Sequence, residues 1–273
     1  MTSPTIELVV TDLDGTFWYG HEEVHPTSVP AWRAIEALGI EVMVATGRRV
    51  ASTRDPLARH GLTPAACAMN GSLLVDLATT RRVYTHAHEP DAAQHVLDGF
   101  AARDLRPCVY VDHDDFDVVY DGAPSTHPRH FASLGATARE VGMSAVVGHI
   151  PVLMFGIVGH PEAPLHDVAD AIGDAAEVHI SGPDQWGGYT ITATPIGLSK
   201  WDAVTRWCRE SGRDPQRVLA VGDGPNDLEL LDGAAIAVVP STGCGEALQR
   251  ADHVVAPPSD GGWAEILDLV RAS

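Results

Sequence analysis

The chain has 273 residues, of which 45% are hydrophobic, and this length suffices for one large or two modest globular domains with a substantial core. The formal net charge of −19 argues against nucleic acid and anionic membrane surfaces as partners, and any site for an anionic substrate therefore needs local cations. No apolar run approaches the roughly 20 residues of a membrane span. Because residues 1–7 lack the features of a signal peptide and the four cysteines show no close pairing, we expect a cytoplasmic protein with free thiols.

The first part of the chain alternates between strand and helix patterns. In chain order these are a strand at 6–11, a helix at 26–38, a strand at 40–45, a helix at 50–60 and a strand at 65–69. Gly39 and Gly61 follow the two helices, as is typical of helix ends. This βαβαβ order predicts a parallel sheet with helices on its faces.

The pattern changes after Asn70-Gly71. The sequence then predicts, in order, a hairpin of strands at 73–76 and 82–84, a helix at 91–103, a hairpin of strands at 107–113 and 116–120, a strand at 151–158, a helix at 163–172, and strands at 177–181 and 188–194. Residues 122–148 show little periodicity and receive no assignment. Because hairpins make antiparallel sheets, we predict an α+β domain in this middle part of the chain.

Alternation resumes at Ser199, the candidate N-cap of a helix that extends to Ser211. Strands at 217–221, 236–239 and 253–256 and a helix at 263–270 follow. We therefore predict an α/β fold in which one parallel-sheet domain, residues 1–73 and 195–273, is interrupted by an inserted α+β domain, residues 74–194.

Two aspartates follow the first predicted strand, one residue apart, in the sequence Asp12-Leu13-Asp14-Gly15-Thr16. Because side chains alternate along a strand, we expect Asp12 and Asp14 on one side and Leu13 on the other. Carboxylates held that close repel unless a cation lies near them, which indicates a site for a hard cation such as Mg²⁺. A carboxylate in such a site can also attack phosphorus and form an aspartyl-phosphate. The alternative is a simple Asp-Gly turn at the end of a strand.

Two further groups lie near the ends of predicted strands or the start of a helix. Thr46-Gly47 follows the second strand, where a hydroxyl and free backbone N–H groups suit a phosphate, although an ordinary helix start explains the pair as well. Lys200 is the only lysine, beside seventeen arginines. Its ammonium is a compact charge that can contact a phosphate and a carboxylate together. A cation in the first turn of a helix is electrostatically unfavourable, which favours a functional role for Lys200.

The turn from Gly222 to Asp227 carries two carboxylates and an amide directly after an apolar strand. Asp223 is a candidate metal ligand, and Asp227 is a candidate to bind a metal through water or to orient a ligand. In open α/β sheets, ligands bind outside the carboxyl ends of the strands. This turn, Asp12 and Thr46 are all predicted to lie there.

Together these residues resemble the four motifs of the haloacid dehalogenase (HAD) superfamily. The motifs are DxDGT at 12–16, a threonine at 46, a lysine at 200 and GDGxND at 222–227, and their order and spacing fit the family. The sequences at 45–48 and 69–71 resemble the Cof-type branch, subclass IIB, and the large insert fits the α+β cap of that branch. The resemblance implies a Rossmann-like core at 1–73 and 195–273 and a cap at 74–194 that determines substrate specificity.

The resemblance also implies roles for the acidic residues. Asp12 is the nucleophile and binds Mg²⁺ through its other oxygen. Asp14 protonates the leaving alcohol and then activates water, while its backbone carbonyl binds the metal. Asp223 is the third protein ligand of the metal. Asp227 does not bind the metal directly but supports the metal site and Lys200.

The remaining motif residues are implied to hold the phosphate. These are Thr46, Gly47, Lys200 and Asn226, which together supply a hydroxyl, backbone N–H groups, an ammonium and an amide. Phosphoryl transfer depends mainly on such positioning and charge neutralisation. Mg²⁺ and Lys200 supply the positive charge that the acidic chain otherwise lacks.

The function implied by the resemblance is that of a phosphoric monoester hydrolase. It is a Mg²⁺-dependent phosphatase for small phosphorylated metabolites, sugar phosphates among them. A phosphomutase or phosphotransferase that uses the same aspartyl-phosphate is an alternative. A phosphometabolite-binding protein on a silent scaffold is the other alternative, and it is less favoured because no nucleophile or metal ligand is missing. The predicted cap contains no lysine, which argues against a phosphonate-cleaving enzyme.

Three other groups each have two interpretations. The residues at 17–19 either line the gap between core and cap or pack in the core. The group at 113–115 suggests a second metal, but a hairpin turn explains it better. The sequence Trp186-Gly187-Gly188 is either a cap loop that faces substrate or, as we favour, a plain turn.

Overall fold

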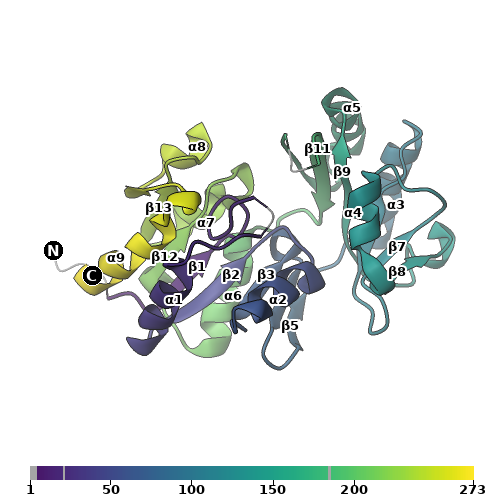
Figure 1. The fold of residues 1–273 in the computed structure, drawn as a ribbon. Helices are drawn as coiled ribbons and strands as arrows, with labels where there is room; N and C mark the ends of the chain where they lie inside the picture. The colour runs from purple at the N-terminus through teal and green to yellow at the C-terminus, as the bar shows by residue number, and fades with distance from the viewer. Residues whose placement is uncertain (1–4, 21, 184–185) are drawn as a thin grey trace. The chain divides into compact units, whose positions relative to one another are not determined.

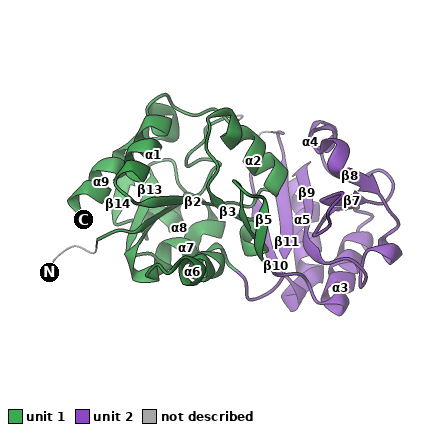
Figure 2. Cartoon of the chain, turned by 90° about the horizontal axis from the view of Figure 1, so that it is seen from below, with its two compact units in different colours: residues 1–84, 199–273 green, residues 85–198 purple. Residues whose placement is uncertain are grey.

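The computed structural model describes residues 5–20, 22–183 and 186–273, and these form two compact units (Figures 1 and 2). Unit 1 contains the described chain up to Tyr84 and from Ser199 onward, and unit 2 contains Thr85 to Leu198. The boundary after Tyr84 lies later than the one expected at 73/74. The reason is that both strands of the hairpin after Gly71 extend the sheet of unit 1.

Unit 1 is built on one twisted sheet with the spatial strand order β14-β13-β12-β1-β2-β3-β4-β5. Neighbouring strands from β14 to β3 are parallel, and β4 is antiparallel to β3. In chain order the strands are β1 (Leu8–Thr11), β2 (Glu41–Ala45), β3 (Ala65–Ala68), β4 (Leu73–Asp76), β5 (Arg81–Thr85), β12 (Val218–Val221), β13 (Ile236–Pro240) and β14 (His253–Val255). The predicted parallel sheet is thereby confirmed.

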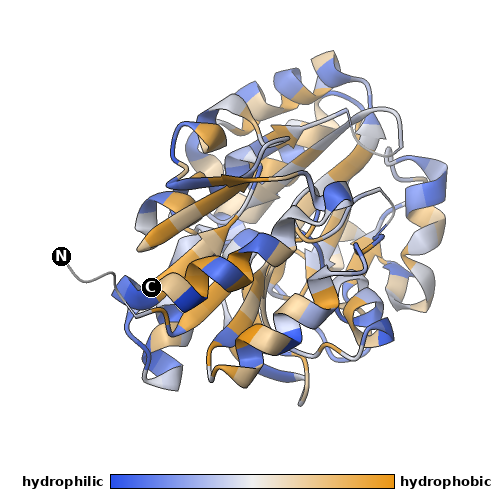
Figure 3. Ribbon diagram, turned by 60° about the vertical axis from the view of Figure 1, so that its left-hand side comes forward, coloured by the Kyte–Doolittle hydropathy of each residue, from blue (hydrophilic) through white to orange (hydrophobic). Residues whose placement is uncertain are grey.

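Helices cover both faces of this sheet. One face packs against α1 (Ser28–Ala37), α2 (Val50–Arg59) and α9 (Ile266–Ala272), and the other against α6 (Lys200–Ser211), α7 (Leu228–Gly233) and α8 (Gly245–Leu248). The alternation along β1 explains this division, because Val9 joins the first core and Leu8 and Val10 join the second. Figure 3 shows strands coloured mainly as hydrophobic and helices banded in both colours, as buried strands and amphipathic helices require.

Aromatic side chains fill the first core. The rings of Trp32 and Trp263 stack at 5.5 Å, and Phe17 meets both of them edge-on at 5.2 and 5.0 Å. The indole Nε1 of Trp263 donates a hydrogen bond of 2.9 Å to the Thr11 hydroxyl, and both residues are buried. This bond fixes the C-terminal part of the chain to the end of β1, directly before Asp12.

Unit 2 is an α+β domain, as the sequence predicts. Its sheet has the order β10-β11-β9-β6-β7-β8, and the predicted hairpin of β6 and β7 is antiparallel. Helices α3 (Pro90–Ala101) and α5 (Glu162–Ile172) share a core with this sheet. The strands are β6 (Cys108–Val111), β7 (Val118–Tyr120), β8 (Ala138–Glu140), β9 (Val152–His160), β10 (Glu177–Ser181) and β11 (Tyr189–Thr194).

The segment at 122–148, for which the sequence makes no prediction, contains short elements. Among these are α4 (Pro128–Ser133) and the edge strand β8, which runs parallel to β7. Helices α7 and α8 in unit 1 were also not predicted, and they have 6 and 4 residues. Elements this short hold too few turns to produce a recognisable hydrophobic period.

Replacing Thr11 by valine tests the bond between β1 and Trp263. We expect Thr11→Val to lower the free energy of unfolding by about 1–3 kcal/mol, because valine has a similar shape but leaves a buried indole N–H without an acceptor. Urea denaturation measures this difference. In a Trp263→Phe background the same substitution should cost clearly less, and an equal cost in both backgrounds would assign the effect to Thr11 alone.

Candidate active site

The polar residues named from the sequence lie at the carboxyl ends of three adjacent strands. Asp12 follows β1, Thr46 follows β2 and Asp223 follows β12, and these strands are neighbours in the middle of the sheet (Figure 1). Because parallel strands end at the same edge, residues that are far apart in the sequence meet there. The fourth motif residue, Lys200, enters from the first turn of α6.

Lys200 joins two carboxylates in the interior of unit 1. Its Nζ donates hydrogen bonds of 2.7 Å to Asp12 Oδ1 and 2.6 Å to Asp227 Oδ1, and its side chain is fully buried. Burial lowers the pKa of the ammonium, but Asp12 and Asp227 outweigh that effect and raise the pKa above its ordinary value. The predicted N-cap Ser199 is confirmed, since it forms a capping box with Asp202 that fixes the start of α6.

The turn after β12 is organised around the second oxygen of Asp227. This Oδ2 accepts hydrogen bonds of 3.0 Å from the backbone N–H groups of Asp223 and Gly224. A Cβ atom at Gly222 would lie 2.6 Å from the Asp227 side chain, so this position needs a glycine. Asp227 therefore connects Lys200 to the backbone that presents Asp223.

Three carboxylates come close enough to hold one metal ion. One oxygen from each of Asp12, Asp223 and Asp227 lies within 4.8 Å of the others. Burial, followed by the charge of Asp227, raises the pKa of Asp223 to about 7, although the Thr16 hydroxyl donates a 2.8 Å hydrogen bond to its Oδ1. Burial also raises the pKa of Asp12 well above its ordinary value, even though Lys200 acts in the opposite direction. Carboxylates in this state favour a proton or a cation nearby, so the donor set fits Mg²⁺.

Asp14 behaves differently from the expectation that it shares a cation with Asp12. Its carboxylate lies outside the cluster of three and accepts two hydrogen bonds of 2.6 Å from Arg48. The reason is local, because β1 ends at Thr11 and the alternation of side chains does not continue through the turn at Gly15, whose φ is +80°. Its assignment as a ligand through the backbone carbonyl stays a prediction.

The residues named for phosphate binding surround the same end of the sheet. Thr46 is buried, and its Oγ1 accepts a 3.2 Å hydrogen bond from the backbone N–H of Arg48. The Nδ2 of Asn226 donates a hydrogen bond of 2.9 Å to Oδ1 of Asn70. A Cβ atom at Gly47 would lie 3.0 Å from that same Asn70 oxygen, so the glycine permits the close approach of two turns.

Asn70 and Arg48 are site residues to which the sequence analysis gave no role. Both were within reach, because each lies in a short segment that carries the resemblance to the Cof-type branch. A further signal for Asn70 is conformational, since Met69 and Asn70 have φ values of +51° and +53°, uncommon for residues other than glycine. Such backbone strain is often retained at functional sites.

The structure explains two of the three ambiguous groups and gives one contact of the third. Phe17 is fully buried among aromatic residues, so it packs in the core. At the tip of the hairpin in unit 2, His113 accepts a hydrogen bond from the backbone N–H of Asp115 and stacks on Phe116, as a hairpin turn explains. Trp186 stacks on His127 at 5.7 Å, and the residues at 184–185 that precede it lie outside the described part of the chain.

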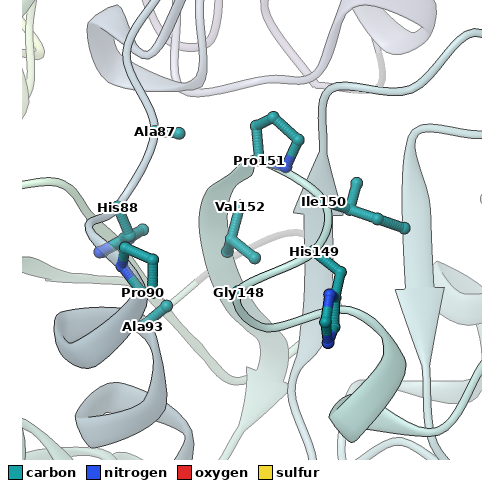
Figure 4. A pocket seen from close by; sticks show the side chains of 9 residues that line it. All are labelled: Ala87, His88, Pro90, Ala93, Gly148, His149, Ile150, Pro151 and Val152. Atoms are coloured by element: carbon teal, nitrogen blue, oxygen red, sulfur yellow. The ribbon is translucent and has the colours of Figure 1, made fainter.

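Unit 2 contains a separate cavity of about 260 Å³ between the start of α3 and the start of β9. Figure 4 shows the side chains that line it, most of which are apolar. Its polar lining residues are His88 and His149. Burial lowers the pKa of His88 to about 4, so this imidazole is neutral at physiological pH. The motif residues lie in unit 1, and none of them lines this cavity.

Comparisons with known proteins identify the family of the chain. A family model described as haloacid dehalogenase-like hydrolase matches residues 9–267, so the chain belongs to this family and the resemblance found in the sequence is confirmed. The chain is 25% identical to a phosphoglycolate phosphatase from Methanopyrus kandleri over 95% of each chain. It is 24% identical to the pyridoxal phosphate phosphatase YbhA of Escherichia coli over 92% of this chain and 90% of that one.

The fold also matches solved structures of this family. A HAD subclass IIB sugar phosphatase superposes with a TM-score of 0.78 at 19% identity, covering 98% of this chain and 100% of that chain. A haloacid dehalogenase-like hydrolase from Bacteroides thetaiotaomicron superposes with a TM-score of 0.77 at 19% identity, covering 97% of this chain and 99% of that chain. The predicted fold class is thereby confirmed. In the part of the chain that the structure describes, no helix is long and apolar enough to span a membrane.

Replacing Asp223 by asparagine tests the metal site without reference to activity. Without metal, we expect Asp223→Asn to unfold at a higher temperature than the wild type, because it removes a half-buried carboxylate beside the buried Asp227 while Oδ1 can still accept from Thr16. Mg²⁺ at about 100 times its Kd should stabilise the wild type by about 2.7 kcal/mol and the variant by much less.

Differential scanning calorimetry with and without Mg²⁺ gives both numbers. Asp115→Asn, at an exposed position in the hairpin turn of unit 2, is the matched control and should respond to Mg²⁺ like the wild type. An undiminished response of Asp223→Asn would remove Asp223 from the metal site.

Proposed function

We propose that this HAD-like hydrolase is a Mg²⁺-dependent phosphatase that acts on small phosphorylated metabolites through an aspartyl-phosphate on Asp12. The observation that carries the proposal is the buried Lys200 ammonium, bonded to both Asp12 and Asp227 at the edge of an acidic cluster. A lone buried cation among carboxylates is expensive to maintain for stability alone. Its place beside the nucleophile suits the binding of a phosphoryl group.

The chemistry follows from the groups that the unit brings together. A carboxylate oxygen of Asp12 forms a bond to phosphorus as the ester P–O bond breaks, and Asp14 gives its proton to the departing alkoxide. A water molecule then attacks phosphorus, Asp14 takes the water's proton, and the bond between Asp12 and phosphorus breaks to release inorganic phosphate. Asp14 suits both transfers because its side chain is half exposed, whereas that of Asp12 is buried.

Charge neutralisation is the second requirement. Asp12, Asp223 and the backbone carbonyl of Asp14 would hold Mg²⁺, which when bound offsets the negative charge of the transferring phosphoryl group. Lys200 supplies the other positive charge at this edge of the sheet. Asp227 keeps Lys200 in place and, through two backbone N–H groups, orients the turn of Asp223.

Thr46, Gly47 and Asn226 complete the proposed phosphate site with a hydroxyl, a backbone N–H and an amide. Thr46 and Gly47 precede α2, where the positive end of the helix dipole attracts anions. The hydrogen bond from Asn226 to Asn70 supports its position in the site. These groups recognise features that all phosphate esters share, so they do not determine which ester is used.

The proposed partners are small phosphorylated molecules. Two of the relatives are a phosphoglycolate phosphatase and a pyridoxal phosphate phosphatase, and a structural neighbour is a sugar phosphatase, so small phosphate esters are the class to test first. The net charge of −19 disfavours nucleic acid and anionic membranes. A reducing cytoplasmic location suits the four cysteines, which are all free thiols.

Replacing the nucleophile tests the proposal directly. We expect Asp12→Asn to remain folded and to lose essentially all turnover of p-nitrophenyl phosphate and of the best substrates from a panel of phosphorylated metabolites, because an amide does not attack phosphorus. Release of inorganic phosphate measures turnover, and transfer of phosphate to a second alcohol would identify a phosphotransferase instead. Asp115→Asn serves again as the control.

Retention of a large fraction of activity by Asp12→Asn would overturn the assignment of the nucleophile. Wild-type protein that binds phosphorylated metabolites but releases no phosphate from any of them with Mg²⁺ present would favour a binding protein and overturn the proposed activity.

Substrate choice is the second part of the proposal. Since the core residues contact groups common to all phosphate esters, we expect discrimination to come from the inserted domain, residues 85–198. Replacing these residues by the cap of a relative with another preference should transfer the ranking of kcat/KM values across a metabolite panel. A ranking that stays with the core, or a phosphoprotein that outperforms all small esters, would contradict this assignment.

A further inference from the structure

The general acid assigned above is held by a residue outside the four motifs. Arg48 binds the carboxylate of Asp14 with two parallel hydrogen bonds, Nε to Oδ2 and Nη2 to Oδ1, each 2.6 Å long. Such a two-point pair fixes the plane and direction of a carboxylate as well as its distance. Asp14 is 49% exposed, and the exposed fraction of Arg48 is 16%, so the less exposed arginine defines the position of the more exposed aspartate.

Arg48 is itself fixed on several sides. Its Nη1 donates a hydrogen bond of 2.6 Å to Oε1 of Glu22. Its guanidinium lies 4.7 Å from the centroid of the ring of Trp18, which is buried. Its backbone N–H donates to Thr46 Oγ1, and its carbonyl accepts from the N–H of Met69. These contacts restrict the conformation of the Arg48 side chain, so the position of the guanidinium determines the position of the Asp14 carboxylate.

Glu22 supports Arg48 from the loop that follows the aspartate motif. Its second oxygen, Oε2, accepts a 2.7 Å hydrogen bond from Arg59 on α2. Its backbone has a φ of +64°, which is uncommon for a residue other than glycine and costs about 1–3 kcal/mol. Two reciprocal hydrogen bonds between Tyr19 and Glu23 hold this loop. Strain that the loop maintains at the residue facing Arg48 indicates a positional role for Glu22.

We propose that Arg48, anchored by Glu22, is a positioning residue that sets the orientation of the Asp14 carboxyl group for proton transfer to the leaving group. This inference rests on the proposed function, since it concerns the step in which Asp14 acts. Without Arg48, a half-exposed aspartate side chain would sample several rotamers, and only some would direct an oxygen toward the departing alkoxide. Glu22 and Trp18 act indirectly, because they restrict the conformation of Arg48 and thereby that of Asp14.

Direct binding of phosphate by Arg48 is the competing explanation. Three of the five N–H groups of its guanidinium donate to carboxylates, two to Asp14 and one to Glu22, and Nη1 also donates to the Ser52 carbonyl. A phosphate bound through two guanidinium N–H groups would therefore have to replace one of these contacts. The two explanations differ in one measurable respect. A phosphate ligand affects every ester, whereas a positioning residue for the general acid affects esters according to their leaving groups.

The experiment is a double-mutant cycle between Arg48 and Asp14, read with two leaving groups. Alcohol release is measured in single turnovers with an alkyl phosphate, whose alkoxide needs a proton, and with p-nitrophenyl phosphate, whose phenolate does not. We expect Arg48→Met to slow release from the alkyl ester at least about tenfold more than release of p-nitrophenolate. In an Asp14→Asn background, the same substitution should change neither rate by more than about twofold, because the group it positions is absent.

Two further variants complete the design. Glu22→Gln, which weakens the anchor while leaving Arg48 in place, should show the same selectivity with a smaller loss of about threefold. Arg54→Met is the matched control, because it removes another arginine, in the middle of α2, whose ion pair is with its exposed neighbour Asp55. It should leave both rates at the wild-type level.

The outcomes separate the inference from the proposed function. Equal losses on both esters for Arg48→Met, or a loss that persists in the Asp14→Asn background, would overturn the positioning role and assign Arg48 to the phosphate. If Arg48→Met slows release from the alkyl ester selectively but Glu22→Gln leaves both rates unchanged, the role of Glu22 as the anchor of Arg48 is overturned. If Asp14→Asn alone slows both esters equally, the acid role of Asp14 fails and the inference fails with it. Full activity of Asp12→Asn would instead overturn the assignment of Asp12 as the nucleophile, which belongs to the proposed function.

Discussion

The contact of the Lys200 ammonium with Asp12 and Asp227 determines the arrangement of the site, because all three groups are buried and none is stable there alone. Removing one partner from such a set leaves an uncompensated charge, which typically costs about 3–5 kcal/mol. With Asp223 included, the cluster holds three carboxylates and one ammonium. The surplus of negative charge at the end of β1 and β12 explains why a divalent cation suits this position.

This contact also constrains how the chain can be arranged. Asp12 and Lys200 are 188 residues apart, and Asp227 lies on a third segment. The chain must therefore leave the parallel sheet after β5, form an independent domain and return at the start of α6 with Lys200 in the first turn. The capping box of Ser199 and Asp202 fixes that start, which places the ammonium at the carboxyl end of β1 despite the unfavourable helix dipole. The insert can vary freely as long as it returns the chain to Ser199.

Much of this organisation could be predicted because it depends on regular patterns. The strands β1, β2 and β12 are mainly apolar, polar groups follow them closely, and parallel strands place such groups together. Lys200 was recognisable because no other lysine competes with it. The buried ion pairs could not be measured from sequence, but the residue types that form them could be named.

The contacts of Asp14 lay outside such reasoning. Alternation along β1 would have placed Asp14 beside Asp12, but the strand ends at Thr11 and the turn at Gly15 has a positive φ. The partner of Asp14 depends on the conformation of one long side chain, that of Arg48, and on a loop residue, Glu22. Neither follows a period of two or 3.6 residues. The short helices α7 and α8 escaped prediction for a related reason, since local hydrogen bonds and turn geometry define them more than hydrophobic repetition does.

The two parts of the site differ in the rigidity that their chemistry requires. The inner set of Asp12, Lys200 and Asp227 is buried, so its electrostatic interactions are strong and its geometry is fixed before substrate arrives. In the proposed mechanism Asp14 exchanges protons with a leaving group and with water, which a fully buried carboxylate between fixed charges would do poorly. Its half-exposed position, with Arg48 as a guide, resolves this conflict. Burial holds the proposed nucleophile, Asp12, and Lys200 beside it, whereas a directional ion pair holds Asp14, the proposed proton-transfer group, and leaves it open to solvent.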